Sequence, residues 1–120
     1  MKTYRGSCHC GRVVFEIESG LEKFVTCNCS ICRRKGALML RVPAEHFRLV
    51  QGEEALATYE FNTGAARHHF CRHCGIYPFH RPRVAPEAYA VNANCLDLEP
   101  DEIARVPVTE FDGRALSTVD

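Results

Sequence analysis

Apolar and polar residues alternate along much of the chain, in short runs that end at glycine or proline. The clearest run places Val13, Phe15 and Ile17 on one side and Arg12, Val14, Glu16 and Glu18 on the other. Because successive side chains of a β-strand point to opposite faces, this period of two predicts a strand with one buried face. Similar reasoning predicts strands over residues 37–42, 47–50, 55–62, 66–71, 75–80, 88–94 and 108–111, with a hairpin turn at Asn62, Thr63 and Gly64.

Helix is predicted only in two brief segments. Pro43 begins a single turn that runs to His46, and Pro100 begins a short helix over residues 100–105 with acidic side chains in its first turn. Pro107 prevents that helix from continuing. The chain is therefore predicted to be mainly β, as a sandwich, a barrel or folded antiparallel sheets with short helical turns.

Length and charge restrict the kinds of partner. A chain of 120 residues fits one domain, and its 15 basic residues balance its 15 acidic residues. A formal net charge of zero argues against a nucleic-acid module or a polybasic membrane surface. No apolar run approaches the roughly 20 residues needed to cross a bilayer, and residues 1–6 lack the apolar stretch of a signal peptide. We therefore expect a cytoplasmic protein with neither nucleic acid nor membrane as a partner.

Cysteine is the most informative component of the composition. The chain has eight, namely Cys8, Cys10, Cys27, Cys29, Cys32, Cys71, Cys74 and Cys95. In a reducing compartment such a set indicates metal binding or catalysis rather than disulfides. Two cysteines separated by one residue on a strand lie roughly 6.5 Å apart or more at Cα, too far for an unstrained bridge. Their side chains point the same way, which suits two thiolates that hold one ion.

Two matched motifs each contain two cysteines followed by a glycine, and they read Cys8-His9-Cys10-Gly11 and Cys71-Arg72-His73-Cys74-Gly75. The glycine permits a positive φ, so that backbone amides can face the sulfurs. The four cysteines, here called the quartet, are the ligand set of a tetrahedral structural zinc. Binding free energy at such a site, on the order of 10 kcal/mol or more, is folding free energy, so we expect the metal-free protein not to fold. Lone histidines are more often surface or supporting residues, and we leave out the possible rival ligands His9, His68, His69, His73 and His80.

Cys27, Cys29 and Cys32 lie within six residues of one another and form a second candidate site, here called the trio. Two interpretations compete. In one, Cys95 is a fourth ligand and the site is closed. In the other, Cys95 packs on the apolar face of its strand, and the trio keeps a position for water or substrate. We favour the open site, because three nearby thiolates match a catalytic zinc, and expect the trio to be both ligating and catalytic.

Basic residues follow the trio directly. An open zinc could bind an incoming thiolate, lower the pKa of that thiol and fix its sulfur. Arg33, Arg34 and Lys35 could then hold the carboxylates of a thiol-bearing peptide, and the alternative is that they form a solvated turn. Seven thiolates (−7) and two Zn²⁺ ions (+4) would shift the formal charge by −3, a deficit that requires local cations. We expect Arg33 and Arg34 to bind the co-substrate.

Four motifs, in this order and spacing, resemble the glutathione-dependent formaldehyde-activating enzymes, a family that also includes centromere protein V. They are Gly6-Ser7-Cys8-His9-Cys10-Gly11, Cys27-Asn28-Cys29-Ser30-Ile31-Cys32-Arg33, Phe70-Cys71-Arg72-His73-Cys74-Gly75 and Asn94-Cys95-Leu96-Asp97. The resemblance covers residues 6 to about 97. It implies a β-tent of antiparallel sheets, a fold shared with methionine-R-sulfoxide reductases, in one zinc-binding domain over residues 1–120.

The same resemblance implies that the quartet holds a structural zinc and the trio a catalytic zinc. The family's reaction condenses glutathione with formaldehyde to S-hydroxymethylglutathione and is a carbon–sulfur lyase activity. We therefore expect two zinc ions, glutathione as co-substrate, and a small-molecule thiol adduct of formaldehyde or a related electrophile as substrate. The shared motifs describe metal binding rather than substrate contacts.

Two other functions are compatible with these features. A non-catalytic zinc module that binds a protein would have its second site closed by Cys95 or empty. A sulfoxide reductase would need a free redox cysteine, and only Cys95 could serve; its apolar neighbours disfavour a low thiolate pKa. The trio and its adjacent cations favour the lyase.

Overall fold

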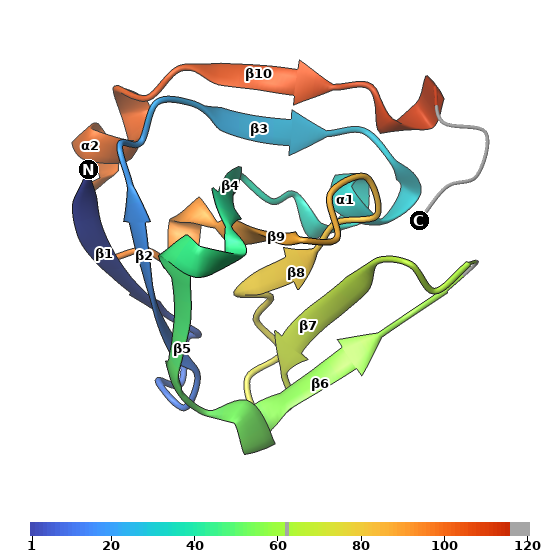
Figure 1. Ribbon diagram of the computed structural model, residues 1–120, viewed down its shortest axis with the longest axis horizontal. Helices are drawn as coiled ribbons and strands as arrows, with labels where there is room; N and C mark the ends of the chain where they lie inside the picture. Colours follow the sequence, from blue (N-terminus) through green and yellow to red (C-terminus); the bar gives the residue numbers. More distant parts are fainter. Residues whose placement is uncertain (62, 116–120) are drawn as a thin grey trace.

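The computed structural model describes residues 1–61 and 63–115. Its strands form two sheets that meet at an angle, like the sides of a tent (Figure 1). The smaller sheet has the order β1-β2-β5, with β1 at Lys2–Ser7, β2 at Val14–Ser19 and β5 at Phe47–Gln51. The larger sheet has the order β10-β3-β4-β9-β8-β7-β6, and its strands are β3 (Phe24–Cys27), β4 (Met39–Pro43), β6 (Leu56–Tyr59), β7 (Arg67–Cys71), β8 (Phe79–Arg81), β9 (Ala88–Asn92) and β10 (Val108–Phe111).

Helices are short and connect the strands. α1 spans Ser30–Lys35 and α2 spans Pro100–Ala104, and 3₁₀ turns lie at Ala44–His46, Glu53–Ala55, Ala93–Cys95 and Gly113–Ala115. In α2 a proline opens the first turn and two glutamates form a capping box, which stabilises the first backbone amides. The predicted mainly β class with folded sheets and short helical turns is confirmed.

Within the described residues, no helix has the length and apolar character that a membrane crossing requires.

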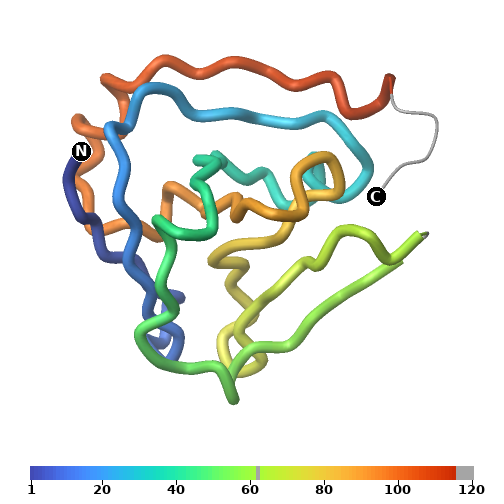
Figure 2. The backbone as a smooth tube through the Cα atoms, viewed as in Figure 1, coloured from blue at the N-terminus to red at the C-terminus, as the bar shows by residue number. Residues whose placement is uncertain are grey.

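One strand departs from the predicted antiparallel arrangement. β10 runs parallel to β3, with Val108 opposite Phe24 and Phe111 opposite Cys27. Figure 2 shows this C-terminal segment, in red, alongside β3, in blue. All other pairings are antiparallel among the described strands, including the predicted hairpin of β6 and β7. Asn62, in the predicted turn of that hairpin, lies outside the described residues.

The prediction of a strand over residues 75–80 is wrong for residues 75–78. Gly75 has a φ of +78° and its N–H donates to the Cys71 carbonyl at 2.8 Å, so the chain turns back there. The Cys71 N–H donates to the Ile76 carbonyl at 2.9 Å and completes the turn. The strand therefore begins only at Phe79.

The core lies between the two sheets. Phe15 and Ile17 of β2, on the face that alternation predicted to be buried, are at most 1 % exposed. The Phe15 ring lies 5.8 Å from both the Phe47 and the Phe79 ring, which joins β2 to β5 and to β8 of the larger sheet. Burying a side chain of this size stabilises a fold by about 1.5–3 kcal/mol, so this aromatic cluster is a main contact between the sheets.

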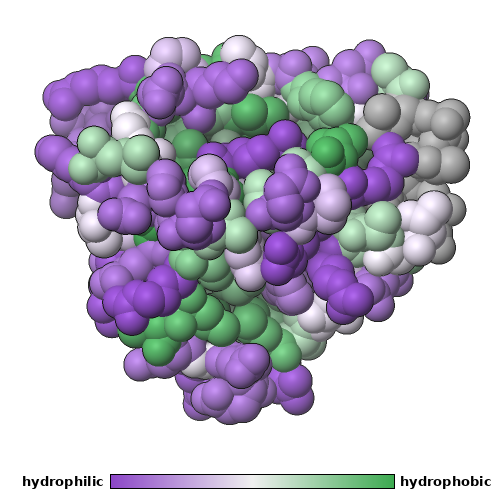
Figure 3. All heavy atoms as spheres, in the orientation of Figure 1, coloured by the Kyte–Doolittle hydropathy of each residue, from purple (hydrophilic) through white to green (hydrophobic). Residues whose placement is uncertain are grey.

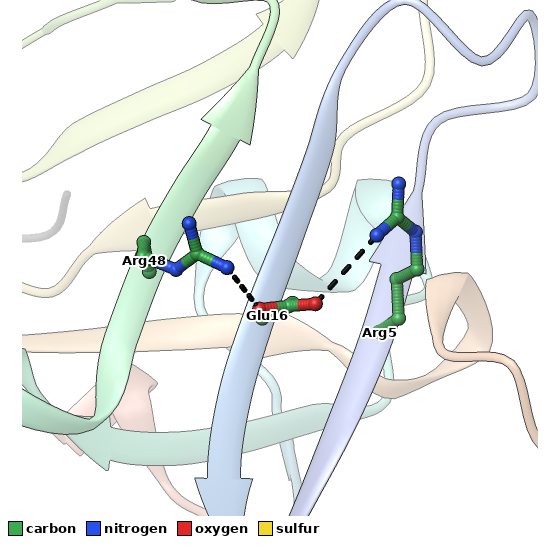
Figure 4. Close-up of polar contacts among 3 residues, drawn as sticks. All are labelled: Arg5, Glu16 and Arg48. Carbon is green, nitrogen blue, oxygen red and sulfur yellow. Dashed lines mark hydrogen bonds and ion pairs between the residues drawn. The ribbon is translucent and has the colours of Figure 1, made fainter.

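The outer face of the smaller sheet carries charge instead. Glu16 on β2 lies between Arg5 on β1 and Arg48 on β5, which are its neighbours in the strand register, and pairs with both (Figure 4). Both arginines are more than half exposed, so each pair contributes at most about 1 kcal/mol. Glu16 therefore contributes more to the register of the three strands than to the free energy of unfolding.

Gly52, in the turn after β5, and Gly64, in the turn after β6, form a matched pair that tests how closely the first turn packs against the β1–β2 loop. Both have positive φ, +97° and +72°, but a Cβ on Gly52 would lie 2.2 Å from the Arg12 carbonyl oxygen, whereas no described atom lies within 4 Å of one on Gly64. We expect Gly64→Ala to cost about 1 kcal/mol of unfolding free energy, and Gly52→Ala at least about 2 kcal/mol more. Urea unfolding of the metal-loaded variants measures both values. Equal costs would contradict the packing described.

Candidate functional site

The quartet is assembled from two distant turns. Cys8 and Cys10 lie in the loop between β1 and β2, and Cys71 and Cys74 lie at the end of β7 and in the turn that follows. The Sγ atoms of Cys8 and Cys10, and of Cys10 and Cys71, are each 3.7 Å apart, and all four lie within 4.8 Å of one another. A tetrahedral zinc with Zn–S bonds of about 2.3 Å has sulfurs about 3.8 Å apart. The spacing therefore fits a four-coordinate thiolate site.

Backbone amides face these sulfurs. The Val13 N–H donates to Cys8 Sγ at 3.3 Å, and the His73 N–H donates to Cys71 Sγ at 3.4 Å. At Cys10, the Arg12 backbone N–H and then the Arg12 guanidinium lower the pKa of the thiol to about 6. Hydrogen bonds of this kind stabilise the thiolate form, which is the form that binds metal.

The trio is formed by a strand end and a helix start. Cys27 ends β3, Cys29 is the N-cap of α1, and Cys32 lies on its buried side. α1 then ends at Gly36, whose φ of +61° allows its N–H to donate to the Cys32 carbonyl at 3.0 Å. These turns bring the three Sγ atoms within 4.8 Å of one another. Within the described residues, no fourth Cys, His, Asp or Glu ligand atom lies within that distance of all three.

The electrostatics of the trio allow three thiolates only in the presence of a cation. Burial raises the pKa of Cys27, and burial followed by the charges of Cys29 and Cys27 raises that of Cys32. Burial would also raise the pKa of Cys29, but hydrogen bonds, first from the Cys32 N–H at 3.4 Å, outweigh it and lower the value. Three thiolates therefore do not coexist here without a positive charge, and the donor set fits a metal ion.

Cys95 lies apart from the trio. Its thiol donates to the Tyr77 carbonyl oxygen at 3.7 Å, and its side chain packs partly against the main core. Burial, and then the charges of Cys8 and Cys74, raise its pKa to about 11. The nearby charges belong to the quartet, so this arrangement leaves the trio with three thiol ligands among the described residues.

A cavity of about 80 Å³ opens on the trio. Its lining includes the trio and, from the larger sheet and its loops, Met39, Arg41, Ala66, His68, His80, Arg83, Val84 and Phe111. The C-terminal segment forms one wall, because Asn28 donates to Asp112 at 2.9 Å and accepts from the Arg114 N–H at 2.9 Å. A Cβ on Gly113 would lie 2.7 Å from Cys27 Sγ, so only glycine fits against the sulfur without displacement.

The residues of both cysteine sites lie within the match to a protein-family model. The model described as "Glutathione-dependent formaldehyde-activating enzyme" matches residues 3–111. The chain belongs to this family. Among solved structures, a crystal structure of a Rhodobacter sphaeroides protein, a structural-genomics target, is 42% identical to this chain, with a TM-score of 0.79. The match covers 88% of this chain and 99% of that one. The family model spans the quartet and the trio, and the solved structure covers most of the chain.

In this member of the formaldehyde-activating family, the predicted cations point in different directions. Arg33 and Arg34 are exposed in the last turn of α1, and Arg34 donates to the Ser30 carbonyl at 2.8 Å. Lys35 instead turns inward, with its Nζ 2.9 Å from His68 Nδ1 and 3.7 Å from the centre of the Tyr77 ring. Burial lowers its pKa to about 8.

Sequence reasoning missed the polar residues behind the cavity. His68 and His80 are buried and face each other across β7 and β8, and the buried Tyr77 has its hydroxyl 2.6 Å from His80 Nδ1. A signal was present for His68, because its strand position has the parity of the buried Ala66, and a histidine on an apolar face is unusual. The cavity cation Arg41 carried no comparable signal.

Replacing Cys95 and Cys32 in turn tests which cysteines hold metal. We expect Cys95→Ala to keep the metal content of the wild-type protein, since its sulfur bonds the Tyr77 carbonyl rather than joining the trio. We expect Cys32→Ala to lose one equivalent per chain. Elemental analysis of purified protein measures both. A loss of one equivalent in Cys95→Ala would make Cys95 a ligand and the trio a closed site.

Proposed function

We propose that this protein is a zinc-dependent carbon–sulfur lyase that acts on glutathione adducts of formaldehyde or a related small electrophile. The observation that carries the proposal is a three-thiol site that opens on a small cavity. A structural zinc site has four protein ligands, whereas a catalytic one keeps three. The quartet matches the first description and the trio the second.

The two sites have different roles in this proposal. The quartet ties the β1–β2 loop to the end of β7 in a single zinc-binding domain over residues 1–120. Cys27, Cys29 and Cys32 would hold a zinc ion, which would lower the pKa of the glutathione thiol. A reducing cytoplasm, where glutathione keeps thiols free, suits this chemistry.

The reaction needs no redox partner. The glutathione sulfur forms a bond to the aldehyde carbon, the π electrons of the C=O bond move to oxygen, and the proton lost by the thiol ends on that oxygen. Lyase action is the reverse, in which the carbon–sulfur bond breaks and the C=O bond forms again. A cavity of about 80 Å³ has room for a small electrophile such as formaldehyde beside the trio.

The body of glutathione is too large for the cavity and would lie outside it, along exposed cations. Arg41 lines the mouth of the cavity and is itself exposed, while Arg33 and Arg34 lie at the exposed end of α1. Guanidinium groups bind carboxylates in a charge-assisted, often bidentate manner. We therefore assign the two carboxylates of glutathione to this surface.

Formaldehyde exchange tests the activity. We expect zinc-loaded protein to accelerate the exchange between glutathione plus formaldehyde and S-hydroxymethylglutathione, measured by NMR exchange spectroscopy. Cys32→Ala should reduce the rate to background because it removes a ligand, and Cys95→Ala is the matched control that should retain it.

An absence of acceleration at every zinc loading would remove formaldehyde as the substrate. Full zinc content with no acceleration would favour the alternative, a non-catalytic zinc-binding module involved in protein interaction.

Arginine substitutions test how glutathione binds. We expect Arg41→Ala and the double variant Arg33→Ala/Arg34→Ala each to raise the KM for glutathione by about tenfold at unchanged kcat, because each removes binding common to the ground and transition states. Arg105→Ala is the control, since this exposed arginine pairs with Asp101 on α2. Steady-state kinetics at one ionic strength measure all three. A KM that stays at the wild-type value in a variant excludes that arginine from the binding surface.

A further inference from the structure

A buried polar cluster lies beside the trio and has no place in the proposal so far. It consists of Lys35, His68, Tyr77 and His80, of which both histidines line the cavity. The two imidazole rings stack with centroids 5.1 Å apart, and the Tyr77 hydroxyl lies 2.6 Å from His80 Nδ1. Polar groups are costly to bury, so a cluster of four against the cavity of a small domain calls for a function.

The hydrogen bond between Lys35 and His68 fixes the state of the histidine ring. A lysine ammonium has only donors, so Nδ1 of His68, 2.9 Å from Nζ, is the acceptor. The proton of the neutral ring must then be on Nε2. Burial, and then the charge of Lys35, lower the pKa of His68 to about 4, so the ring stays neutral near pH 7.

Nε2 of His68 is the unused donor of this cluster. His68 is 3 % exposed, and its Nε2 has no hydrogen-bond partner among the residues that the structure describes. The Tyr77 hydroxyl, by contrast, is engaged by His80 and lies 3.3 Å from the Ala90 carbonyl oxygen. His68 lines the cavity, so an acceptor atom of a bound substrate could satisfy this buried donor once the ring and the substrate move to meet each other.

We infer that His68 is a catalytic residue that donates a hydrogen bond from Nε2 to the oxygen on the carbon next to the substrate sulfur. This inference rests on the proposed lyase function and adds an oxygen-binding group to it. Lys35 acts as a positioning residue, because its bond to Nδ1 selects the tautomer that places the proton on Nε2. The site then favours adducts that carry an oxygen on that carbon, since other adducts leave the donor unpaired.

The hydrogen bond matters most while charge develops on oxygen. When sulfur attacks the carbonyl carbon, the C=O π pair moves to oxygen, and the Nε2–H group stabilises the negative charge until the thiol's proton arrives there. In the lyase direction the hydroxyl proton passes to the departing sulfur, the C=O bond forms again and the carbon–sulfur bond breaks. His68 ends each turnover in its starting tautomer, so no net proton is gained or lost.

Two substitutions at His68 and one at its neighbour test the assignment. We expect His68→Phe to lower kcat by about 10²-fold with KM within about threefold, because a lost oxyanion donor acts on the transition state. His68→Gln, whose amide can place a donor near Nε2, should stay within about tenfold of wild type. The control is His69→Phe, on the opposite face of β7, where the histidine lies 2.9 Å from the Thr58 hydroxyl; it should stay within about twofold.

Metal content, measured on the same samples, separates catalysis from structure. The inference predicts full metal content in His68→Phe. A wild-type kcat in His68→Phe would overturn the inference. So would a His68→Gln variant that is as slow as His68→Phe while both lose metal, because His68 would then have a structural role. If the wild-type protein does not accelerate the exchange, the proposed function fails instead.

A second measurement does not depend on activity. Ring ¹⁵N NMR of the metal-loaded, histidine-labelled protein should show His68 with its proton on Nε2, and the Nε2 signal should shift when S-hydroxymethylglutathione is added. Lys35→Met should lose this single tautomer. A proton on Nδ1 in the wild-type protein would overturn the inference whatever the kinetics.

Discussion

The four sulfur atoms of the quartet lie together where the β1–β2 loop of the smaller sheet meets the end of β7 in the larger sheet. The quartet joins residues about sixty positions apart, and it does so where the smaller sheet would otherwise meet the larger one mainly through aromatic rings. A structural zinc site contributes on the order of 10 kcal/mol, comparable with the net stability of a whole domain. A zinc ion in the quartet, as proposed, would add to the core contacts that Cys8 and Cys71 already make between the β1–β2 loop and the end of β7.

The order of strands in the larger sheet places the chemistry. β9, β8 and β7 are neighbours, which sets His80 opposite His68, while β3 and α1 bring the trio to the other side of the same cavity. Tyr77 packs with Cys29 and Cys32, while its carbonyl accepts the Cys95 thiol. This tyrosine therefore lies between the trio and the segment next to the quartet, and the two cysteine sites share one framework.

The sequence predicted the parts of the structure that depend on local pattern and on ligand spacing. Alternation in β2, the two cysteine–glycine motifs and the proline at the start of α2 each have a local physical cause, and each appears as expected. The sequence pattern did not predict α1, because its N-cap is Cys29 rather than Ser, Thr, Asp or Asn. The parallel pairing of β10 and the inward turn of Lys35 depend on contacts between distant residues, which no local pattern encodes.

The N-cap of α1 has a consequence for how the protein responds to chelators. The Cys29 sulfur accepts the Cys32 N–H, and it is also one of the trio's donor atoms. Release of an ion from the trio would let this sulfur bind a proton, which would weaken the hydrogen bond that it accepts in the first turn. The helix that carries Lys35 would then fray as coordination is lost. Amide exchange along six residues would then report occupancy of a spectroscopically silent ion.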